Sequence, residues 1–182
     1  KEIKLHPSGK IFDIEKYVQA GRPEAGGKFD VMPTDIATDL TAVIKEGDEQ
    51  QSLQKQGFTH KLQVRRIREV NNSSAVMLEA VKKRIPQNWA SMHPDDFDGN
   101  AISDGKSVVI ESDHGRISAI LKADTSIRPG VISMTHSWGG LPGEIDQEPG
   151  ENVNLLISTE THIEPINAMV RMSAIPVRIS SV

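Results

Sequence analysis

Hydrophobic and polar residues alternate in several short stretches of the chain, the pattern typical of strands with one buried face. The alternation is regular over 60–66. Shorter apolar runs at 131–134 and 175–179 predict further strands. Pro176 favours an edge position or a strand start for the last of these, because proline has no N–H to give to a sheet.

Two of the alternating stretches predict a β-hairpin. The stretches 106–112 and 116–123 are joined by the turn residues Asp113-His114-Gly115. One face of the second arm carries only the apolar residues Ile117, Ala119 and Leu121.

Helical spacing is clearest after Thr34, which has the character of an N-cap. Four apolar residues recur there at intervals of three and four, namely Ile36, Leu40, Val43 and Ile44. We expect Gly47 to end this helix and the polar, Gln-rich stretch 46–57 to form an exposed loop.

A second helix is expected over 75–84, ended by Pro86, and a single helical turn is expected to begin at Pro94. Many short strands with few helices and several Gly and Pro turns indicate a mainly β barrel or sandwich with flanking helices.

Composition narrows the class of protein. The chain has 182 residues, 37% of them hydrophobic, with a net charge of −4, which is an ordinary globular composition without a basic surface for nucleic acid. No apolar run approaches the roughly 18 residues that span a bilayer. We therefore expect no membrane insertion and a cytoplasmic location, with the periplasm as the alternative. Because the sequence opens on Lys1 rather than Met, we expect a longer parent chain.

The sequence contains no cysteine. Disulfides, thiolate metal ligands, iron–sulfur ligation and a cysteine nucleophile are thereby excluded within this chain. We expect 1–27 to be a lead-in or linker and 28–182 to form one domain.

Candidate binding chemistry begins where the first strand ends. Three arginines are followed there by amide and hydroxyl side chains, which suit an anionic ligand that also forms hydrogen bonds. The alternative is a solvated loop with a serine cap on the next helix. The candidates are Arg65, Arg66, Arg68, Asn72 and Ser73.

A second candidate loop follows the strand at 131–134. His136 and Trp138 stand two residues apart beside Gly139-Gly140, and they offer an imidazole and a flat indole surface. The alternative is that both rings cover the hydrophobic core.

His93 and Asp96 flank Pro94 and could contact a ligand. The alternative is that they cap the helical turn that begins at Pro94.

The order of these motifs resembles the C-terminal dinucleotide-binding domain of the molybdopterin oxidoreductases, the dimethyl sulfoxide reductase superfamily. The resemblance covers about 29–179. It is carried by Arg65-Arg66-Ile67-Arg68 with Asn72-Ser73, Met92-His93-Pro94-Asp95-Asp96, Ile102-Ser103-Asp104-Gly105, a hairpin through Gly115, Ile127-Arg128-Pro129-Gly130-Val131, His136-Ser137-Trp138-Gly139, Val153-Asn154, Glu164-Pro165 and Val177-Arg178-Ile179.

The resemblance implies a six-stranded double-psi β-barrel that binds molybdopterin guanine dinucleotide, in a bis form with molybdenum or tungsten, while the metal is ligated and redox chemistry occurs in other domains. It implies that the loop after the first strand, with Arg65, Arg66, Arg68, Asn72 and Ser73, meets the cofactor. It also places His136, Trp138 and Asn154 near the cofactor, and His93 and Asp96 as further contacts. The implied partners are the remaining domains or large subunit of the oxidoreductase, and no catalysis is expected from this domain alone.

Two other functions of such a barrel compete with this one. The barrel could be a stand-alone substrate- or protein-interaction module without cofactor. An autonomous pyruvoyl-dependent decarboxylase matures at a Gly-Ser bond, and the sequence contains no Gly-Ser pair, which argues against that class. A separate small subunit of a molybdenum or tungsten enzyme also stays open.

Overall fold

The chain divides into two units, Lys1–Pro33 and Thr34–Val182. The predicted linker 1–27 lies outside the described residues except at three positions, Leu5, His6 and Gly9. The computed structural model describes residues 5–6, 9, 30–140, 150–161 and 163–182.

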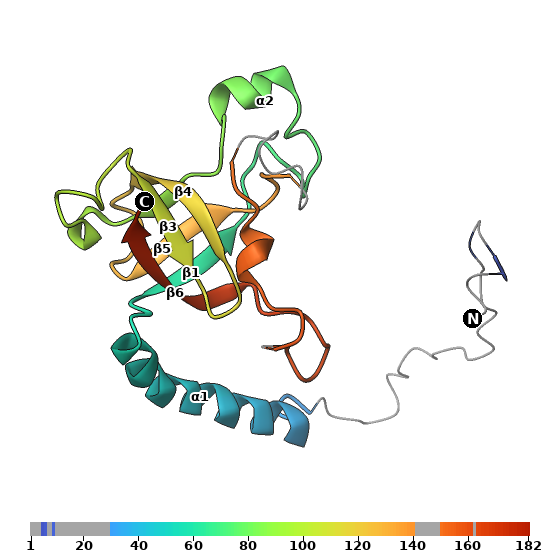
Figure 1. The fold of residues 1–182 in the computed structure, drawn as a ribbon. Coiled ribbons are helices and arrows are strands. Elements are labelled where there is room, and N and C mark those ends of the chain that lie inside the picture. Colours follow the sequence, from blue (N-terminus) through green and yellow to red (C-terminus); the bar gives the residue numbers. More distant parts are fainter. Residues whose placement is uncertain (1–4, 7–8, 10–29, 141–149, 162) are drawn as a thin grey trace. The chain divides into compact units, whose positions relative to one another are not determined.

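Six strands of the second unit close into a barrel (Figure 1). Around the barrel their order is β1, β5, β2, β4, β3, β6. The strands are β1 (His60–Arg65), β2 (Ala90–Met92), β3 (Ser107–Glu111), β4 (Arg116–Ala123), β5 (Val131–Thr135) and β6 (Ser173–Ser181).

The barrel mixes parallel and antiparallel pairs. β1 pairs with β5 and β2 with β4 in parallel, and the other four neighbouring pairs are antiparallel. Both parallel pairs therefore join strands that are distant in sequence. The mainly β, six-stranded double-psi barrel predicted from the sequence is confirmed, and so is the hairpin of β3 and β4.

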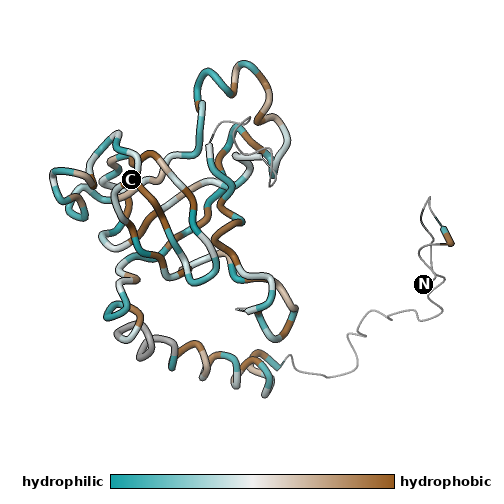
Figure 2. Tube along the Cα trace, viewed as in Figure 1, coloured by the Kyte–Doolittle hydropathy of each residue, from teal (hydrophilic) through white to brown (hydrophobic). Residues whose placement is uncertain are grey.

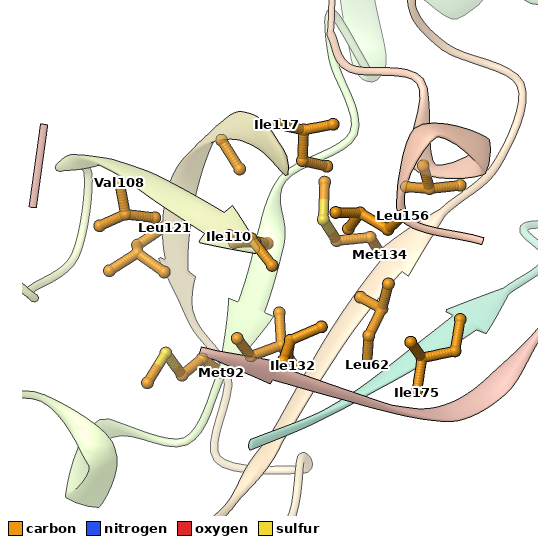
Figure 3. Close-up of a cluster of buried hydrophobic side chains, with 14 of the residues drawn as sticks. Leu62, Met92, Val108, Ile110, Ile117, Leu121, Ile132, Met134, Leu156 and Ile175 are labelled. Atoms are coloured by element: carbon orange, nitrogen blue, oxygen red, sulfur yellow. The ribbon is translucent and has the colours of Figure 1, made fainter. Parts of the chain in front are cut away.

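The barrel interior is filled by the apolar positions of the alternating strands (Figure 3). Leu62 pairs in register with Ile132, and both are fully buried. The predicted apolar face of β4 lies in the same core. The largest fully buried side chains include Leu62, Met92, Ile110, Leu121, Ile132, Met134 and Leu156.

The strand register defines two ends of the barrel. Arg65 pairs with Thr135 where β1 and β5 finish, and β2 begins at this end with Ala90. We call it the arginine end. The opposite end holds His60 and Met92, and the residues of β1 place it roughly 16 Å away at about 3.3 Å per residue.

Helix α1 (Thr34–Lys55) extends much further than its sequence predicts. The prediction that 46–57 forms a loop is wrong, because good helix formers follow Gly47 and outweigh its cost of about 1 kcal/mol. Gly57 ends the helix, with a φ of 89° and a hydrogen bond from the Phe58 N–H to the Leu53 carbonyl. Along α1, hydrophobic residues recur between hydrophilic ones (Figure 2).

Helix α2 (Glu79–Arg84) is shorter than expected. No side chain caps the start of this helix, so the alternative of a serine cap is wrong: residues 71–74 form a turn of their own and the helix starts afterwards. Its predicted end is confirmed, because Ile85 precedes Pro86 and is held out of the helical conformation.

The remaining elements are short. Strand β2 gave no sequence signal, since three residues are too few for a visible alternation. The single turn at Pro94 is confirmed as η3 (Pro94–Asp96), and the apolar segment near Asn154 forms η5 (Val153–Leu156). Pro176 lies in β6 ahead of the residues that pair with β3, so its missing N–H breaks no pairing on that side.

Candidate functional site

Arg65 lies at the last position of β1, on the outer face of the barrel, because Leu62 and Val64 point inward. Its Nη2 donates to the Ser91 hydroxyl at 3.2 Å. Its Nε is buried and has no hydrogen-bond partner among the described residues. A buried donor without a partner among the protein groups is rare in folded proteins, and stored strain, a bound water or a bound ligand can account for it.

The chain leaves β1 through two successive four-residue turns. The first is closed by a bridge between Ile67 and Val70, and the second by a bridge between Asn71 and Ser74. Arg66, Arg68, Asn72 and Ser73 are exposed within this loop. Arg66 Nη1 donates to Asn72 Oδ1 at 2.7 Å, so these two predicted residues are brought together.

The loop carries a local excess of positive charge. Its one carboxylate, Glu69, is paired with Arg84 of α2 at 2.9 Å. The pKa of Asp124 is lowered mainly by hydrogen bonds from Ser126, with Arg65 a smaller cause. Arg65 therefore has a nearby carboxylate in Asp124, and the exposed guanidinium groups of Arg66 and Arg68 are the cations that this loop presents.

His136 follows β5 and reaches back to the end of β1. Its Nδ1 lies 3.2 Å from the Arg65 carbonyl oxygen. Because a carbonyl can only accept, Nδ1 must carry the proton, and the neutral ring then presents Nε2 as an acceptor. This bond joins the two predicted loops at the arginine end.

A second contact joins the same loops. The Ser137 hydroxyl donates to the Asn72 carbonyl. Both residues have positive φ, 83° for Ser137 and 54° for Asn72, and Ala75 nearby in the sequence has 76°. Such conformations cost energy for residues with a side chain, and they are often found at ligand sites held by surrounding structure.

Trp138 is only 4% exposed and packs in a small hydrophobic cluster with Val70 and Val81. The indole therefore presents little surface on which a ligand could stack, and for this ring the structure favours the alternative of a buried hydrophobic position. The indole lies beneath the loop that follows β1, so it supports that loop from inside.

Asn154 is exposed on η5, immediately after a segment that contacts the His136 loop. Asn152 Nδ2 donates to the Gly140 carbonyl at 3.4 Å, and Asn152 Oδ1 accepts from the Asn154 N–H. The segment before η5 thus lies at the arginine end. A Cβ on Gly139 would lie 2.4 Å from the Asn152 nitrogen. Only glycine therefore lets the backbone of Asn152 pack this closely.

His93 and Asp96 lie at the opposite end of the barrel. His93 Nδ1 accepts from the Asp95 N–H at 3.1 Å, which confirms the capping interpretation. Asp96 Oδ2 accepts from the Gly130 N–H at 2.7 Å and lies 4.0 Å from His60 Nε2. The two residues order η3 and the turn before β5.

Asn88 is a residue that sequence reasoning missed. It is 4% exposed and forms hydrogen bonds to both the end of β5 and the segment before η5. An asparagine two residues before a three-residue strand gives no local signal. Only its burial reveals its importance.

Within the described part of the chain, no group of three or more His, Asp or Glu side chains could hold a metal ion. Across those same residues, no helix combines the length and apolarity that a bilayer span requires.

Comparison with known families decides the class. The family model described as "Molydopterin dinucleotide binding domain" matches residues 61–175. The chain belongs to this family. The match confirms the resemblance and the cofactor class, a molybdopterin dinucleotide, and it spans all the candidate residues from Arg65 to Asn154.

The domain is also similar to a solved structure, acetylene hydratase from Pelobacter acetylenicus. The TM-score is 0.63 at 18% sequence identity, with 75% of this chain and 20% of that chain covered. At this identity the likeness supports the fold, and the domain spans about a fifth of the length of that enzyme. A search of curated proteins gave no match.

Proposed function

We propose that this domain binds molybdopterin guanine dinucleotide, in its bis form with molybdenum or tungsten, as part of a larger oxidoreductase whose other domains hold the metal. The remaining domains of that enzyme are the proposed partners. The cofactor and its metal supply the redox chemistry when bound. The domain supplies affinity, orientation and positive potential.

One observation carries the proposal: the unpartnered Nε of Arg65. A guanidinium presents a planar fork of donors that matches the oxygens of a phosphate. Arg65 already uses Nη2 on Ser91, which fixes the plane of the group. The dinucleotide carries phosphates, so it can accept the hydrogen bond that the protein leaves unmade.

The neighbouring loop offers further matching groups. Arg66 is held by Asn72 and keeps its other N–H donors for an anion. Asn72 uses Oδ1 on Arg66, so its amide N–H groups are what it can offer to a ligand, such as a purine oxygen. Arg68 and Ser73 are exposed beside them and complete the set proposed for this loop.

His136 contributes a hydrogen-bond acceptor beside the donors of the loop that follows β1. Its Nε2 accepts, and guanine and pterin rings both carry N–H groups that donate. Asn154 is proposed as a contact from η5, and Trp138 acts indirectly by supporting the loop. His93 and Asp96 lie at the other end of the barrel, so we propose for them an ordering role toward η3 and Gly130.

The proposal is tested with guanosine 5′-diphosphate as a probe of the nucleotide half of the cofactor. We expect the full chain to bind it weakly, because the domains that would complete the site are missing. Arg65→Met should weaken binding about tenfold or more, since a hydrogen bond to a charged group is worth about 1.5–3 kcal/mol. Isothermal titration calorimetry measures both values.

Arg128→Met is the matched control, because it removes the same charge from an exposed residue in the turn that precedes β5, at the opposite end of the barrel. It should leave binding within about twofold of the unsubstituted chain. Equal weakening by both substitutions would show that binding depends on the net charge of the chain and not on the position of Arg65. Absence of binding by the unsubstituted chain would favour an interaction module without cofactor.

A further inference from the structure

The buried side chain of Asn88 forms hydrogen bonds to two other segments of the arginine end. Its Nδ2 donates to the Thr135 carbonyl and to the Glu151 carbonyl, each at 2.8 Å. Its Oδ1 accepts from the Glu151 N–H, also at 2.8 Å. The amide therefore uses both of its donors and its acceptor on backbone groups.

The two loops that Asn88 connects also touch directly. A Cβ on Gly150 would lie 2.6 Å from Asn88 Oδ1 and 2.8 Å from Trp138 Cβ. A Cβ on Gly139 would lie 2.4 Å from the Asn152 nitrogen. The backbones at 138–140 and 150–152 meet without space for a side chain, and Asn88 lies at this junction.

The position of this junction affects two candidate residues, His136 and Asn154. The Thr135 carbonyl directly precedes His136, and Glu151 and Asn152 lead into η5 with Asn154. A shift of either backbone segment would move the candidate side chains, because His136 keeps its orientation only while Nδ1 reaches the Arg65 carbonyl.

We infer that Asn88 is a positioning residue that holds the His136 loop and the Asn154 segment in the arrangement that binds the cofactor. This inference rests on the proposed function. We assign Asn88 no direct contact with the ligand. Asn88 preorganises the His136 loop and the Asn154 segment, so that cofactor binding does not have to order them.

The chemistry of the site requires an amide. An aspartate could still accept from the Glu151 N–H, but its second oxygen would face two carbonyl oxygens in place of the N–H donors that satisfy them. An alanine would remove the three hydrogen bonds to the Thr135 carbonyl and the Glu151 backbone. A serine is polar but too short to reach both segments.

The test uses Asn88→Asp and Asn88→Ser in the full chain, with Ser112→Ala as matched control. Ser112 is also buried, and its hydroxyl donates to the Leu156 carbonyl at 2.9 Å, so it holds the far end of η5. Three quantities are measured: the ¹⁵N shifts of the His136 ring at pH 8, the dissociation constant for guanosine 5′-diphosphate, and the urea midpoint of unfolding.

We expect His136 in the unsubstituted chain to be a single tautomer with the proton on Nδ1. Both Asn88 variants should show a mixture of tautomers and bind the probe at least fivefold more weakly. Ser112→Ala should lower the unfolding midpoint and leave the His136 tautomer unchanged. If Asn88→Asp does not fold, the comparison rests on Asn88→Ser.

The inference is overturned if the Asn88 variants lower the unfolding midpoint and leave the His136 tautomer unchanged, as the control does. It is distinguishable from the proposed function, because the tautomer is read without any ligand. If the unsubstituted chain fails to bind the probe while the Asn88 variants still disturb His136, the proposed function fails and the positioning of His136 stands.

Discussion

His60 is the described residue whose protonation should change stability near neutral pH. It opens β1 with a side chain that is 12% exposed, and its Nδ1 lies 2.8 Å from the Thr59 hydroxyl. Burial lowers the pKa of His60 below its ordinary value, and Asp96 partly opposes this by favouring the charged ring. The desolvation cost of a buried imidazolium is thus the larger effect.

The sign of the pH dependence follows from that direction. In the unfolded chain a histidine takes up its proton near pH 6.5, whereas folded His60 does so only at lower pH. Between these two values the unfolded state binds more protons, so stability falls as pH decreases below about 6.5. Above that range His60 contributes no pH dependence.

We therefore expect His60→Gln to lose less stability between pH 7 and pH 5.5 than the unsubstituted chain does. Urea unfolding at intervals of half a pH unit measures the two slopes. The window stays above the range in which ordinary carboxylates titrate, so their contribution is small. Identical slopes would show that His60 is protonated equally in both states.

At the scale of single elements, α1 contains one glycine and is followed by another, and the two have opposite consequences for the helix. Gly47 lies within the helix, where alanine is better by about 1 kcal/mol. Gly57 follows the helix end with a φ of 89° and open space around its Cα, so alanine there meets only backbone strain, of about 1 kcal/mol.

We expect Gly47→Ala to increase amide hydrogen-exchange protection along α1 and Gly57→Ala to reduce it near Lys55. Exchange is the suitable measurement because it reports on the helix by itself. Increased protection in both variants would indicate that Gly57 is not in the left-handed conformation.

The turn between β3 and β4 is constrained by contact with η5. A Cβ on Gly115 would lie 2.1 Å from the Leu155 carbonyl oxygen, which belongs to backbone and cannot rotate away. We expect Gly115→Ala to destabilise the barrel by about 1–3 kcal/mol through overpacking. Urea unfolding measures the loss.

Gly130→Ala is the comparison for that variant, because Gly130 has a φ of 80° but no atom within 4 Å of an added Cβ. It should cost about 1 kcal/mol, from strain alone. A smaller loss at Gly115 than at Gly130 would mean that η5 moves freely away from the turn.

At the scale of the whole unit Thr34–Val182, the larger hydrophobic cluster of the described residues is the core inside the barrel. Leu62 is fully buried among the inward side chains of the barrel, and Met77 in the loop before α2 is 57% exposed. We expect Leu62→Ala to cost about 2–5 kcal/mol. Met77→Ala should change stability by less than about 0.5 kcal/mol. Equal effects in urea unfolding would contradict the described core.

The barrel also separates the polar residues proposed to bind the cofactor from those that order a turn. At the arginine end, hydrogen bonds join His136 to the Arg65 carbonyl, and Arg66 and Ser137 to Asn72. The opposite end uses His93 and Asp96 to order a turn. Closure of the sheet produces this separation, because it fixes which strand ends are neighbours.

The sequence by itself determined the local structure and the class of the protein. Alternation marked β1 and β4, turn residues marked the hairpin, and Pro86 marked the end of α2, because these signals depend only on nearby residues. The order of motifs indicated the family. The extent of α1 was missed, since Gly47 alone is a weak breaker within a polar helix-forming stretch.

Only the tertiary structure decided which candidate residues act together. The parallel pairing of β1 with β5 brings Arg65 beside Thr135 and so joins loops 70 residues apart in sequence. The same closure buries Trp138, leaves Arg65 Nε without a partner and makes Asn88 a link between two loops. These outcomes depend on long-range register, which no short stretch of sequence encodes.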